Sequence, residues 1–213
     1  MIATYFFDID GTLLDSAPDI CAATRQACRE TRRPEPSDCE VRRYIGRPLA
    51  ETFTGLCPGI SQAEIEELSR LYTECYRALA HAHTRIFPGI PEALAALPGR
   101  KSTATTKKSA TAAAVLDQFG LRRYFDYVQG SDNGRYKPDP AILLEAIAVL
   151  KVRPEECLMV GDAPADIEAG KRAGMKTCAV AWGYGDATEL RRLAPSLWIE
   201  RPEELLAAAR LRT

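Results

Sequence analysis

The chain has little of three features that mark common functional classes: surplus positive charge, long apolar runs and histidine. Its 28 basic and 29 acidic residues are interspersed, for a formal net charge of -1. This balance argues against a nucleic-acid binder, which carries a basic patch, and against a surface for anionic membranes. No apolar run approaches the roughly 20 residues of a membrane span. The start also lacks the pattern of a signal peptide, so we expect a cytoplasmic protein without nucleic-acid or membrane partners.

Histidine and cysteine offer little material for metal, triad or redox chemistry. The two histidines, His81 and His83, would face different directions on a helix. The seven cysteines are odd in number and include no Cys-x-x-Cys pair. Cys21 and Cys28 lie seven residues apart and therefore share one helical face. We expect reduced thiols that mostly serve as small apolar side chains.

Two patterns of secondary structure divide the 213 residues. After an opening strand, residues 16 to 85 contain helical stripes and no convincing strand. A capping box, Ser61 with Glu64, opens the longest of these helices. The expected helices are Pro18–Arg32, Asp38–Ile45 with Asp38 as a possible cap, Pro48–Leu56, and one starting at Ser61.

From Phe87 onward, short apolar runs alternate with amphipathic helices, which is typical of βαβ units and a parallel sheet. One of the helices should begin at Asp139-Pro140, a cap before a proline, and another should span Pro202–Leu211. The expected strands are Thr4–Ile9, Lys101–Thr105, Tyr127–Gly130, Cys157–Gly161, Thr177–Ala181 and Leu197–Ile199.

These patterns predict an α/β fold with a doubly wound, Rossmann-like parallel sheet core and an inserted all-helical cap domain. The core would comprise residues 1–15 and 87–213, and the cap residues 16–86. An insertion directly after the first strand would lie above the strand ends. It is placed to act as a lid, with hinges near residues 14–17 and 85–89.

Two carboxylates, Asp8 and Asp10, leave the first apolar run one residue apart, and Gly11 turns the chain directly after them. Because strand side chains alternate, both carboxylates would point the same way at the strand exit. Backbone N–H groups of the Gly11 turn could receive an anion there. Mg²⁺, which binds through carboxylates and substrate phosphate, would relieve the repulsion. A hairpin turn is the alternative interpretation, since Asp-Gly between apolar residues is a standard turn signal.

A second acidic cluster repeats the pattern of an apolar strand leading into Gly161-Asp162. If a helix begins near Ala163, Asp166 lies in its first turn, on the side of Asp162. These carboxylates could complete an oxygen-rich metal site shared with Asp8. Alternatively, Asp162 is a helix cap and Asp166 a favourable charge near a helix N-terminus.

Hydroxyl groups and positive charge come from two further loops. Thr105 and Thr106 follow a strand, and Lys137 precedes the stiff Pro-Asp-Pro segment. Hydroxyls and backbone N–H groups suit phosphate oxygens, and a lysine offers a charge to a phosphoryl group. An ordinary surface lysine is the alternative for Lys137, and we interpret Lys107 and Lys108 as solvated.

Taken together, these motifs resemble those of the haloacid dehalogenase superfamily of phosphohydrolases, in the family's order. The resemblance covers nearly the whole chain. It includes features similar to the phosphoglycolate-phosphatase-like branch with a helical cap, such as Gly46-Arg47-Pro48 and Trp182-Gly183-Tyr184. The four motifs are Phe7–Leu13, Thr105–Lys107, Lys137-Pro138, and Gly161-Asp162 with Asp166.

The resemblance implies that Asp8 is the nucleophile, which forms an aspartyl-phosphate, and that Asp10 is the general acid and base. Mg²⁺ would be held by Asp8, the backbone carbonyl of Asp10, Asp162 and Asp166, the last directly or through water. Thr105 and Lys137 would hold the phosphoryl group, although Thr103 and Thr106 are close enough for the register to differ. Gly11 and Thr106 are further substrate contacts. Arg47 in the cap would reach the substrate's other end, or it is a surface arginine.

We therefore expect a Mg²⁺-dependent phosphatase that hydrolyses a small phosphorylated metabolite, with 2-phosphoglycolate as the best single substrate. The alternatives are a phosphomutase on a sugar phosphate, a pyrophosphatase, and a non-catalytic module that binds a phosphate ligand. A dehalogenase is disfavoured, because phosphoryl transfer needs the metal carboxylates and carbon–halogen displacement does not. The sequence makes no prediction of oligomeric state.

Overall fold

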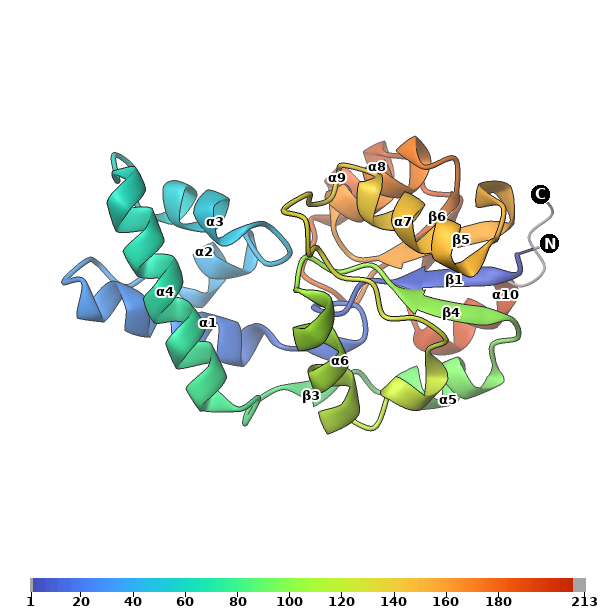
Figure 1. The fold of residues 1–213 in the computed structure, drawn as a ribbon, viewed down its shortest axis with the longest axis horizontal. Helices are drawn as coiled ribbons and strands as arrows, with labels where there is room; N and C mark the ends of the chain where they lie inside the picture. Colours follow the sequence, from blue (N-terminus) through green and yellow to red (C-terminus); the bar gives the residue numbers. More distant parts are fainter. Residues whose placement is uncertain (1, 209–213) are drawn as a thin grey trace. The chain divides into compact units, whose positions relative to one another are not determined.

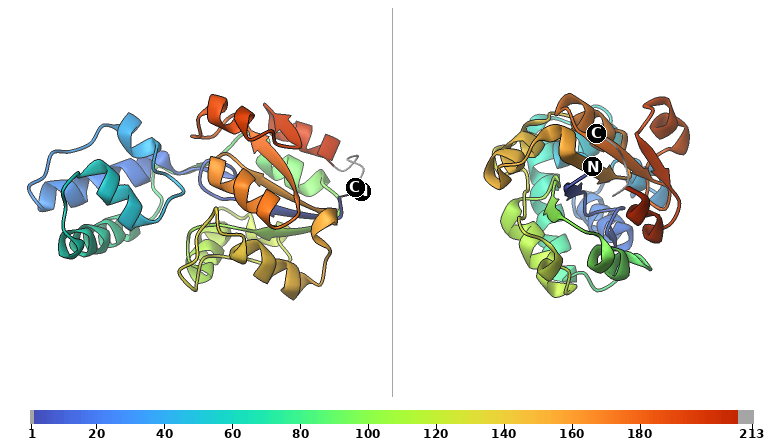
Figure 2. Two further views of the ribbon diagram at one scale, coloured as in Figure 1. Left: turned by 90° about the horizontal axis from the view of Figure 1, so that it is seen from above. Right: turned by 90° about the vertical axis from the view of Figure 1, so that its right-hand side faces the viewer.

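The computed structural model describes residues 2–208. It divides into two compact units, one formed by residues 1–14 and 86–213 and the other by residues 15–85. We call them the sheet unit and the helical unit. Figures 1 and 2 show the path of the chain through both.

Five parallel strands form the sheet of the sheet unit, in the order β4-β1-β5-β6-β7. If these five strands are renumbered 1 to 5 in the order of the chain, their order across the sheet is 2-1-3-4-5. In this doubly wound order the chain connections run in opposite directions from β1 and β5, and ligands bind at the carboxyl ends of strands at such a point. Figure 1 shows β1 between β4 and β5. The strands are β1 (Thr4–Phe7), β4 (Arg100–Thr103), β5 (Cys157–Gly161), β6 (Lys176–Val180) and β7 (Leu197–Ile199).

β1 lies inside the sheet, with a neighbouring strand on each side, and all four of its residues are buried. Such apolar runs suit a strand covered on both faces. Phe7 is in register with Thr103 of β4 and with Val160 of β5. The strand ends at Phe7, two residues before the predicted end, because the Ile9 carbonyl already accepts the N–H groups of Leu13 and Leu14.

Helices cover both faces of the sheet, which confirms the predicted doubly wound α/β class. Side chains of α5, α6 and α10 pack on one face, and those of α7, α8 and α9 pack on the other. The helices are α5 (Ile90–Ala96), α6 (Ser109–Gln118), α7 (Ala141–Leu150), α8 (Pro164–Arg172), α9 (Ala187–Arg192) and α10 (Leu205–Ala208).

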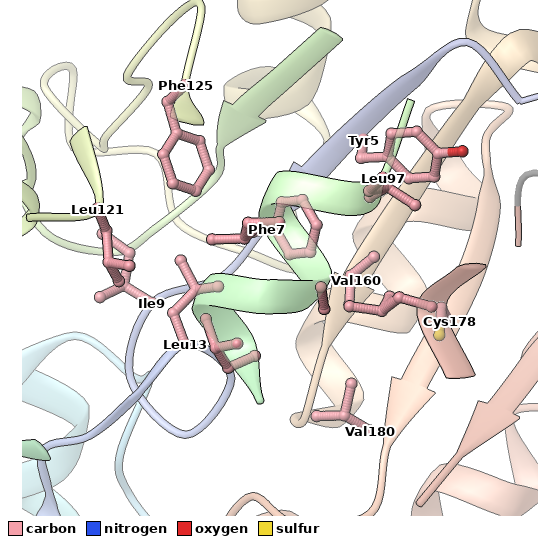
Figure 3. Close-up of a cluster of buried hydrophobic side chains, with 14 of the residues drawn as sticks. Tyr5, Phe7, Ile9, Leu13, Leu97, Leu121, Phe125, Val160, Cys178 and Val180 are labelled. Atoms are coloured by element: carbon pink, nitrogen blue, oxygen red, sulfur yellow. The ribbon is translucent and has the colours of Figure 1, made fainter. Parts of the chain in front are cut away.

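The larger core cluster lies on the face covered by α5 (Figure 3). Phe7 meets Phe125 edge to face, with ring centroids 6.0 Å apart. Val160 from β5 and Val180 from β6 join them, so one apolar layer ties three neighbouring strands together. Burial of aromatic side chains is a large contribution to stability, and here it fixes the strands whose ends carry the acidic residues.

The predicted strand Tyr127–Gly130 is wrong. This segment makes only two isolated bridges, Ser102 to Tyr127 and Thr105 to Gly130. The Thr103 hydroxyl explains the interruption, because it donates to the Gln129 carbonyl and accepts from the Gln129 N–H, both at 2.9 Å. A side chain thus takes the place of continuous ladder bonds.

Two predicted ends in the sheet unit also differ. The Asp139 cap is present in modified form: Asp139 accepts from the Ala141 N–H at 2.9 Å, and α7 starts after Pro140. The predicted helix Pro202–Leu211 starts as a 3₁₀ turn, Pro202–Glu204, and continues as α10. The part of that prediction beyond residue 208 lies outside the described residues.

The helical unit holds four helices, α1 (Ala17–Glu30), α2 (Asp38–Arg42), α3 (Leu49–Leu56) and α4 (Gln62–Leu79). The predicted capping box at Ser61 and Glu64 is confirmed. The cap of α2 is Ser37, not Asp38: Ser37 forms a capping box with Glu40, and Asp38 is the first helical residue. Apolar residues of α1, α3 and α4, including Cys28, Phe53 and Leu68, form the core.

The boundary between the units falls inside two short strands, β2 (Leu14–Asp15) and β3 (Arg85–Ile86), which pair as a two-stranded sheet. All seven cysteines are free thiols, and five of them are buried. Within residues 2–208, none of the helices combines the length and the apolar character that crossing a membrane requires.

Candidate active site

The turn after β1 carries Asp8 and Asp10, and both residues are buried: 4% of Asp8 and 6% of Asp10 is exposed. The Gly11 N–H donates to the Leu14 carbonyl at 2.8 Å, which closes a tight turn. Gly11 has a φ of +85°, a conformation that favours glycine. The sequence alternative of a β-hairpin is excluded, because β1 pairs with β4 and β5 in parallel.

The second acidic pair lies at the end of β5, where Asp162 is held at both carboxylate oxygens. The Thr12 hydroxyl donates to Oδ1 at 2.9 Å, and the Tyr184 N–H donates to Oδ2 at 2.8 Å. Asp166 lies in the first turn of α8 and accepts from the Ala163 N–H at 2.9 Å. The N-cap of α8 is Ala163 and not Asp162, so the interpretation of Asp162 as the helix cap is wrong. Asp166 lies near the helix N-terminus, as that interpretation held, and also faces the other carboxylates.

Asp8, Asp162 and Asp166 form one buried cluster, in which a carboxylate oxygen of each lies within 4.8 Å of those of the other two. The sheet explains the proximity, because β1 and β5 are neighbours and their carboxyl ends meet at the same edge. The structure therefore brings together three of the residues that the sequence identified, although 154 positions separate Asp8 from Asp162.

The side chain of Lys137 contacts two carboxylates of this cluster. Its Nζ lies 2.8 Å from Asp8 Oδ1 and 2.5 Å from Asp166 Oδ1, and it also donates to the Ala104 carbonyl at 2.7 Å. Only 3% of its side chain is exposed, so the surface-lysine alternative is wrong. A buried charge is costly unless it is paired, and Lys137 is paired with two carboxylates.

Burial and crowding raise the pKa of two of the carboxyl groups. Desolvation, followed by the negative charges of Asp166, Asp162 and Asp10, raises the pKa of Asp8 to about 8, against the opposing effect of Lys137. Desolvation and Asp166 raise the pKa of Asp162 to about 7. Desolvation lowers the pKa of Lys137, but Asp166 and Asp8 outweigh it, so this pKa lies above its usual value.

The donor set fits a hard divalent cation. Three buried carboxylates provide oxygen ligands, and the pKa values of Asp8 and Asp162 are raised, first by burial and then by the neighbouring carboxylates. Mg²⁺ prefers oxygen ligands and commonly keeps one or two carboxylates together with substrate phosphate. The Asp8–Asp162–Asp166 cluster is therefore chemically suited to Mg²⁺.

Comparison with known proteins agrees with this geometry. The family model described as haloacid dehalogenase-like hydrolase matches residues 5–180, which include all four carboxylates and Lys137. The chain belongs to the haloacid dehalogenase-like hydrolase family. The resemblance identified from the four sequence motifs is thereby confirmed.

Similar proteins cover almost the whole length of this hydrolase. It is 35% identical to "Phosphoglycolate phosphatase 1" of Pseudomonas aeruginosa, over 95% of this chain and 78% of the relative. It is also 35% identical to the phosphoglycolate phosphatase of Aquifex aeolicus, over 94% and 93% of the two chains. Among solved structures, a haloacid dehalogenase-like hydrolase from Streptococcus pneumoniae is 28% identical, with a TM-score of 0.92 over 98% of each chain.

Thr105 is fully buried and lies just beyond β4 in the hydrolase. Its Oγ1 accepts from the Lys107 N–H at 3.3 Å. Thr103 is a poor substitute as a phosphate ligand, because its hydroxyl is bonded to the Gln129 backbone within the sheet region. Thr106 is half-buried in the same loop. Thr105 therefore lies two residues beyond the end of β4, which stops at Thr103 and not at Thr105 as predicted.

The interpretation of Lys107 as a solvated side chain is wrong. Its Nζ lies 2.8 Å from Asp10 Oδ2, and only 13% of the side chain is exposed. The neighbouring Lys108, interpreted in the same way, is exposed. The difference arises from the loop, which directs one of two consecutive lysines inward.

Gly11 and Arg47 are two other expected substrate contacts. The Gly11 N–H donates inside its own turn, so it does not point to an anion. Gly11 instead allows close packing, because a Cβ there would lie 2.3 Å from Asp162 Oδ2. Arg47 belongs to the helical unit, where it is exposed and its guanidinium lies 5.5 Å from the centre of the Tyr44 ring.

The sequence identified the segment after β6 only as part of the family resemblance and did not predict that it supports Asp162. A Cβ on Gly183 would lie 2.1 Å from Asp162 Cβ, and one on Gly185 would lie 1.9 Å from the Asp162 carbonyl oxygen. Trp182 donates its indole N–H to the Thr12 carbonyl at 3.0 Å. The alternating Gly-Tyr-Gly pattern after a strand is the signal that could have indicated this close approach.

Proposed function

We propose that this hydrolase is a Mg²⁺-dependent phosphatase that hydrolyses a small phosphomonoester through an aspartyl-phosphate on Asp8. The observation that carries the proposal is the position of Asp8, whose carboxylate is 2.8 Å from Lys137 and shares a cluster with Asp162 and Asp166. A carboxylate, a paired cation and an oxygen-rich metal site at one strand exit are the parts that phosphoryl transfer requires.

In the first half of the reaction, a carboxylate oxygen of Asp8 attacks phosphorus. The ester P–O bond breaks, and Asp10 gives its proton to the departing alkoxide. In the second half, Asp10 takes a proton from water as the water oxygen attacks phosphorus. The bond to Asp8 then breaks, and inorganic phosphate leaves with the Asp8 carboxylate restored. Asp10 thus ends with the proton it had at the start.

Lys137 orients Asp8 by holding its Oδ1, and its ammonium charge offsets the negative charge of the phosphoryl group. Thr105 and the half-buried Thr106 are the hydroxyl residues proposed to contact phosphoryl oxygens. Asp8, the Asp10 backbone carbonyl, Asp162 and Asp166 would hold Mg²⁺, the last directly or through water. When bound, Mg²⁺ supplies electrostatic stabilisation of the charge on the transferring group.

The best single substrate is 2-phosphoglycolate. Support comes from relatives with this activity in their names, at 35% identity over nearly the whole chain. Arg47, in the helical unit, stays the predicted contact for the substrate's non-reacting end, and the role of that unit as a lid stays a prediction. A cytoplasmic location likewise stays a prediction from sequence.

A panel of phosphate esters tests this proposal. The purified protein is incubated with 2-phosphoglycolate, sugar phosphates, nucleotides and pyrophosphate, each with Mg²⁺ and with a chelator. We expect Mg²⁺-dependent release of inorganic phosphate, with the highest kcat/KM for 2-phosphoglycolate. Isomerised sugar phosphate in place of free phosphate would instead identify a mutase. No metal-dependent release from any ester would refute the phosphatase.

A further inference from the structure

Lys107 lies beside the carboxylate that the proposed mechanism directs at the leaving group. Its Nζ is 2.8 Å from Asp10 Oδ2, and both side chains are largely buried, with 13% and 7% exposed. Because Asp10 protonates the departing ester oxygen, a cation in contact with Asp10 is also a near neighbour of that oxygen. Lys107 therefore adjoins the alcohol half of the substrate.

The backbone of Lys107 is anchored on both sides. Its N–H donates to Thr105 Oγ1 at 3.3 Å, and its carbonyl accepts from the Ser131 N–H at 2.8 Å. Gly130 allows this packing, since a Cβ there would lie 2.3 Å from the Lys107 carbonyl oxygen. The loop thus holds this lysine in place, and a positioned charge discriminates between ligands better than a mobile one.

Lys137 and Lys107 contact carboxylates that have different roles in the proposed reaction. Lys137 contacts Asp8 and Asp166, on the side that receives the phosphoryl group. Lys107 contacts Asp10, on the side from which the alcohol departs. A cation there is of little use to a neutral alcohol, but it pairs with an alcohol that carries a negative group close to the ester oxygen.

We propose that Lys107 is a specificity residue, which selects esters whose leaving alcohol bears a carboxylate on the carbon next to the ester oxygen. The inference rests on the proposed phosphatase function and on Asp10 as the proton donor. In such an ester a single carbon separates the carboxylate from the oxygen that Asp10 contacts. An ammonium group has three donors, so contact with Asp10 and contact with a substrate carboxylate are compatible.

The decisive comparison uses two substrates that differ in one group. 2-Phosphoglycolate carries the carboxylate, and 2-hydroxyethyl phosphate has a neutral hydroxyl group at the same end. Lys107→Met removes the charge, Lys107→Arg keeps it, and Lys108→Met is the matched control on the exposed neighbour. The thermal midpoint of each variant shows whether it is folded.

In Lys107→Met, we expect kcat/KM for 2-phosphoglycolate to fall about 10- to 100-fold relative to kcat/KM for 2-hydroxyethyl phosphate, the size expected for a lost charge-assisted hydrogen bond. Lys107→Arg should keep most of the preference, and Lys108→Met should leave both values unchanged. An equal fall for both esters would overturn the proposal, because Lys107 would then only orient Asp10. Unchanged values would overturn it too. If the wild-type protein hydrolyses no phosphate ester, the phosphatase proposal itself fails.

Discussion

At the scale of single residues, Asp162 illustrates how much support a buried carboxylate requires. Thr12 and Tyr184 bond its two oxygens, and Gly11 and Gly183 make room for its side chain. These contacts come from the turn after β1 and from the segment after β6. The orientation of one proposed metal ligand therefore depends on two chain segments that flank β5.

Thr12→Val tests this support, because valine keeps the shape of threonine but removes the hydroxyl that donates to Asp162 Oδ1. We expect the Mg²⁺ concentration for half-maximal activity to rise about tenfold, the typical effect of losing a hydrogen bond to a metal ligand. Thr12→Ser restores the donor and should restore the wild-type value. An unchanged Mg²⁺ requirement in Thr12→Val would show that the hydroxyl does not orient Asp162 for the metal.

The sequence predicted which carboxylates would meet, because each follows a buried strand and ends of parallel strands share an edge. It did not predict the place of Lys107. Two consecutive lysines have the same local signal. The Lys107 N–H donates to Thr105 Oγ1 and the Lys107 carbonyl accepts from the Ser131 N–H, and only these backbone bonds direct its side chain to Asp10. Contacts between distant loops carry no local pattern.

At the scale of elements, the start of α1 and the end of the helical unit are joined by one buried side chain. Asp19 accepts from the Thr84 N–H and hydroxyl, both at 2.7 Å, and from the His83 N–H at 3.1 Å. Burial raises the pKa of Asp19, but the bonds from Thr84 and His83 outweigh it, so this pKa lies below its usual value. The charged form is thus favoured in the folded protein.

Asp19→Asn should lower the free energy of unfolding by about 1.5–3 kcal/mol at pH 7, because it replaces charge-assisted bonds and points amide donors at other donors. A carboxyl group whose pKa is lowered on folding stabilises the folded protein at pH values above its unfolded pKa of about 3.9. This stabilisation is lost as the pH falls through the pKa of the folded state. The difference from wild type should therefore shrink below about pH 4.

Urea unfolding measures the Asp19→Asn effect, and hydrogen exchange in α1 and α4 locates it. Asp117→Asn, at an exposed position of α6, is the control and should leave the stability unchanged. An equally large loss of stability in the control would contradict the account. So would hydrogen exchange that becomes faster in the sheet unit but not in the helical unit.

Periodicity and caps predicted most elements, because helical stripes and strand runs are local. The capping box at Ser61 and the helix after Asp139 are examples. The segment 127–130 reads as a strand because it is apolar, yet its pairing is interrupted by the Thr103 hydroxyl bonded to Gln129. Whether a side chain replaces the backbone hydrogen bonds of a strand pair depends on the partner strand, so the sequence of residues 127–130 alone cannot predict it.

At the scale of the whole molecule, the buried carboxylates link stability, metal and pH. The folded pKa values of Asp8 and Asp162, about 8 and about 7, exceed the unfolded value of about 3.9. Groups with raised folded pKa values contribute stability that is complete below the unfolded pKa and is lost as pH rises through the folded values. Without a divalent cation, the protein should therefore lose stability between about pH 4 and pH 8.

Mg²⁺ requires the ionised carboxylates, so its stabilising effect should grow over the same range. We expect the rise in thermal midpoint on adding Mg²⁺ in place of a chelator to be larger at pH 8 than at pH 6. Asp162→Asn, which lacks one proposed ligand, should reduce the rise at pH 8. Equal rises at both pH values in the wild-type protein would show that these carboxylates do not bind the cation.

The central claim is that Asp8 forms a covalent bond to phosphorus, and the most direct test is to trap that bond. The protein is mixed with 2-phosphoglycolate and Mg²⁺, quenched in acid during turnover, digested and analysed by peptide mass spectrometry. We predict a phosphoryl group on Asp8 in the wild-type protein. In Asp8→Asn we predict neither adduct nor turnover, with the fold intact by circular dichroism. Substantial turnover by Asp8→Asn, or an adduct on a residue other than Asp8, would contradict the account.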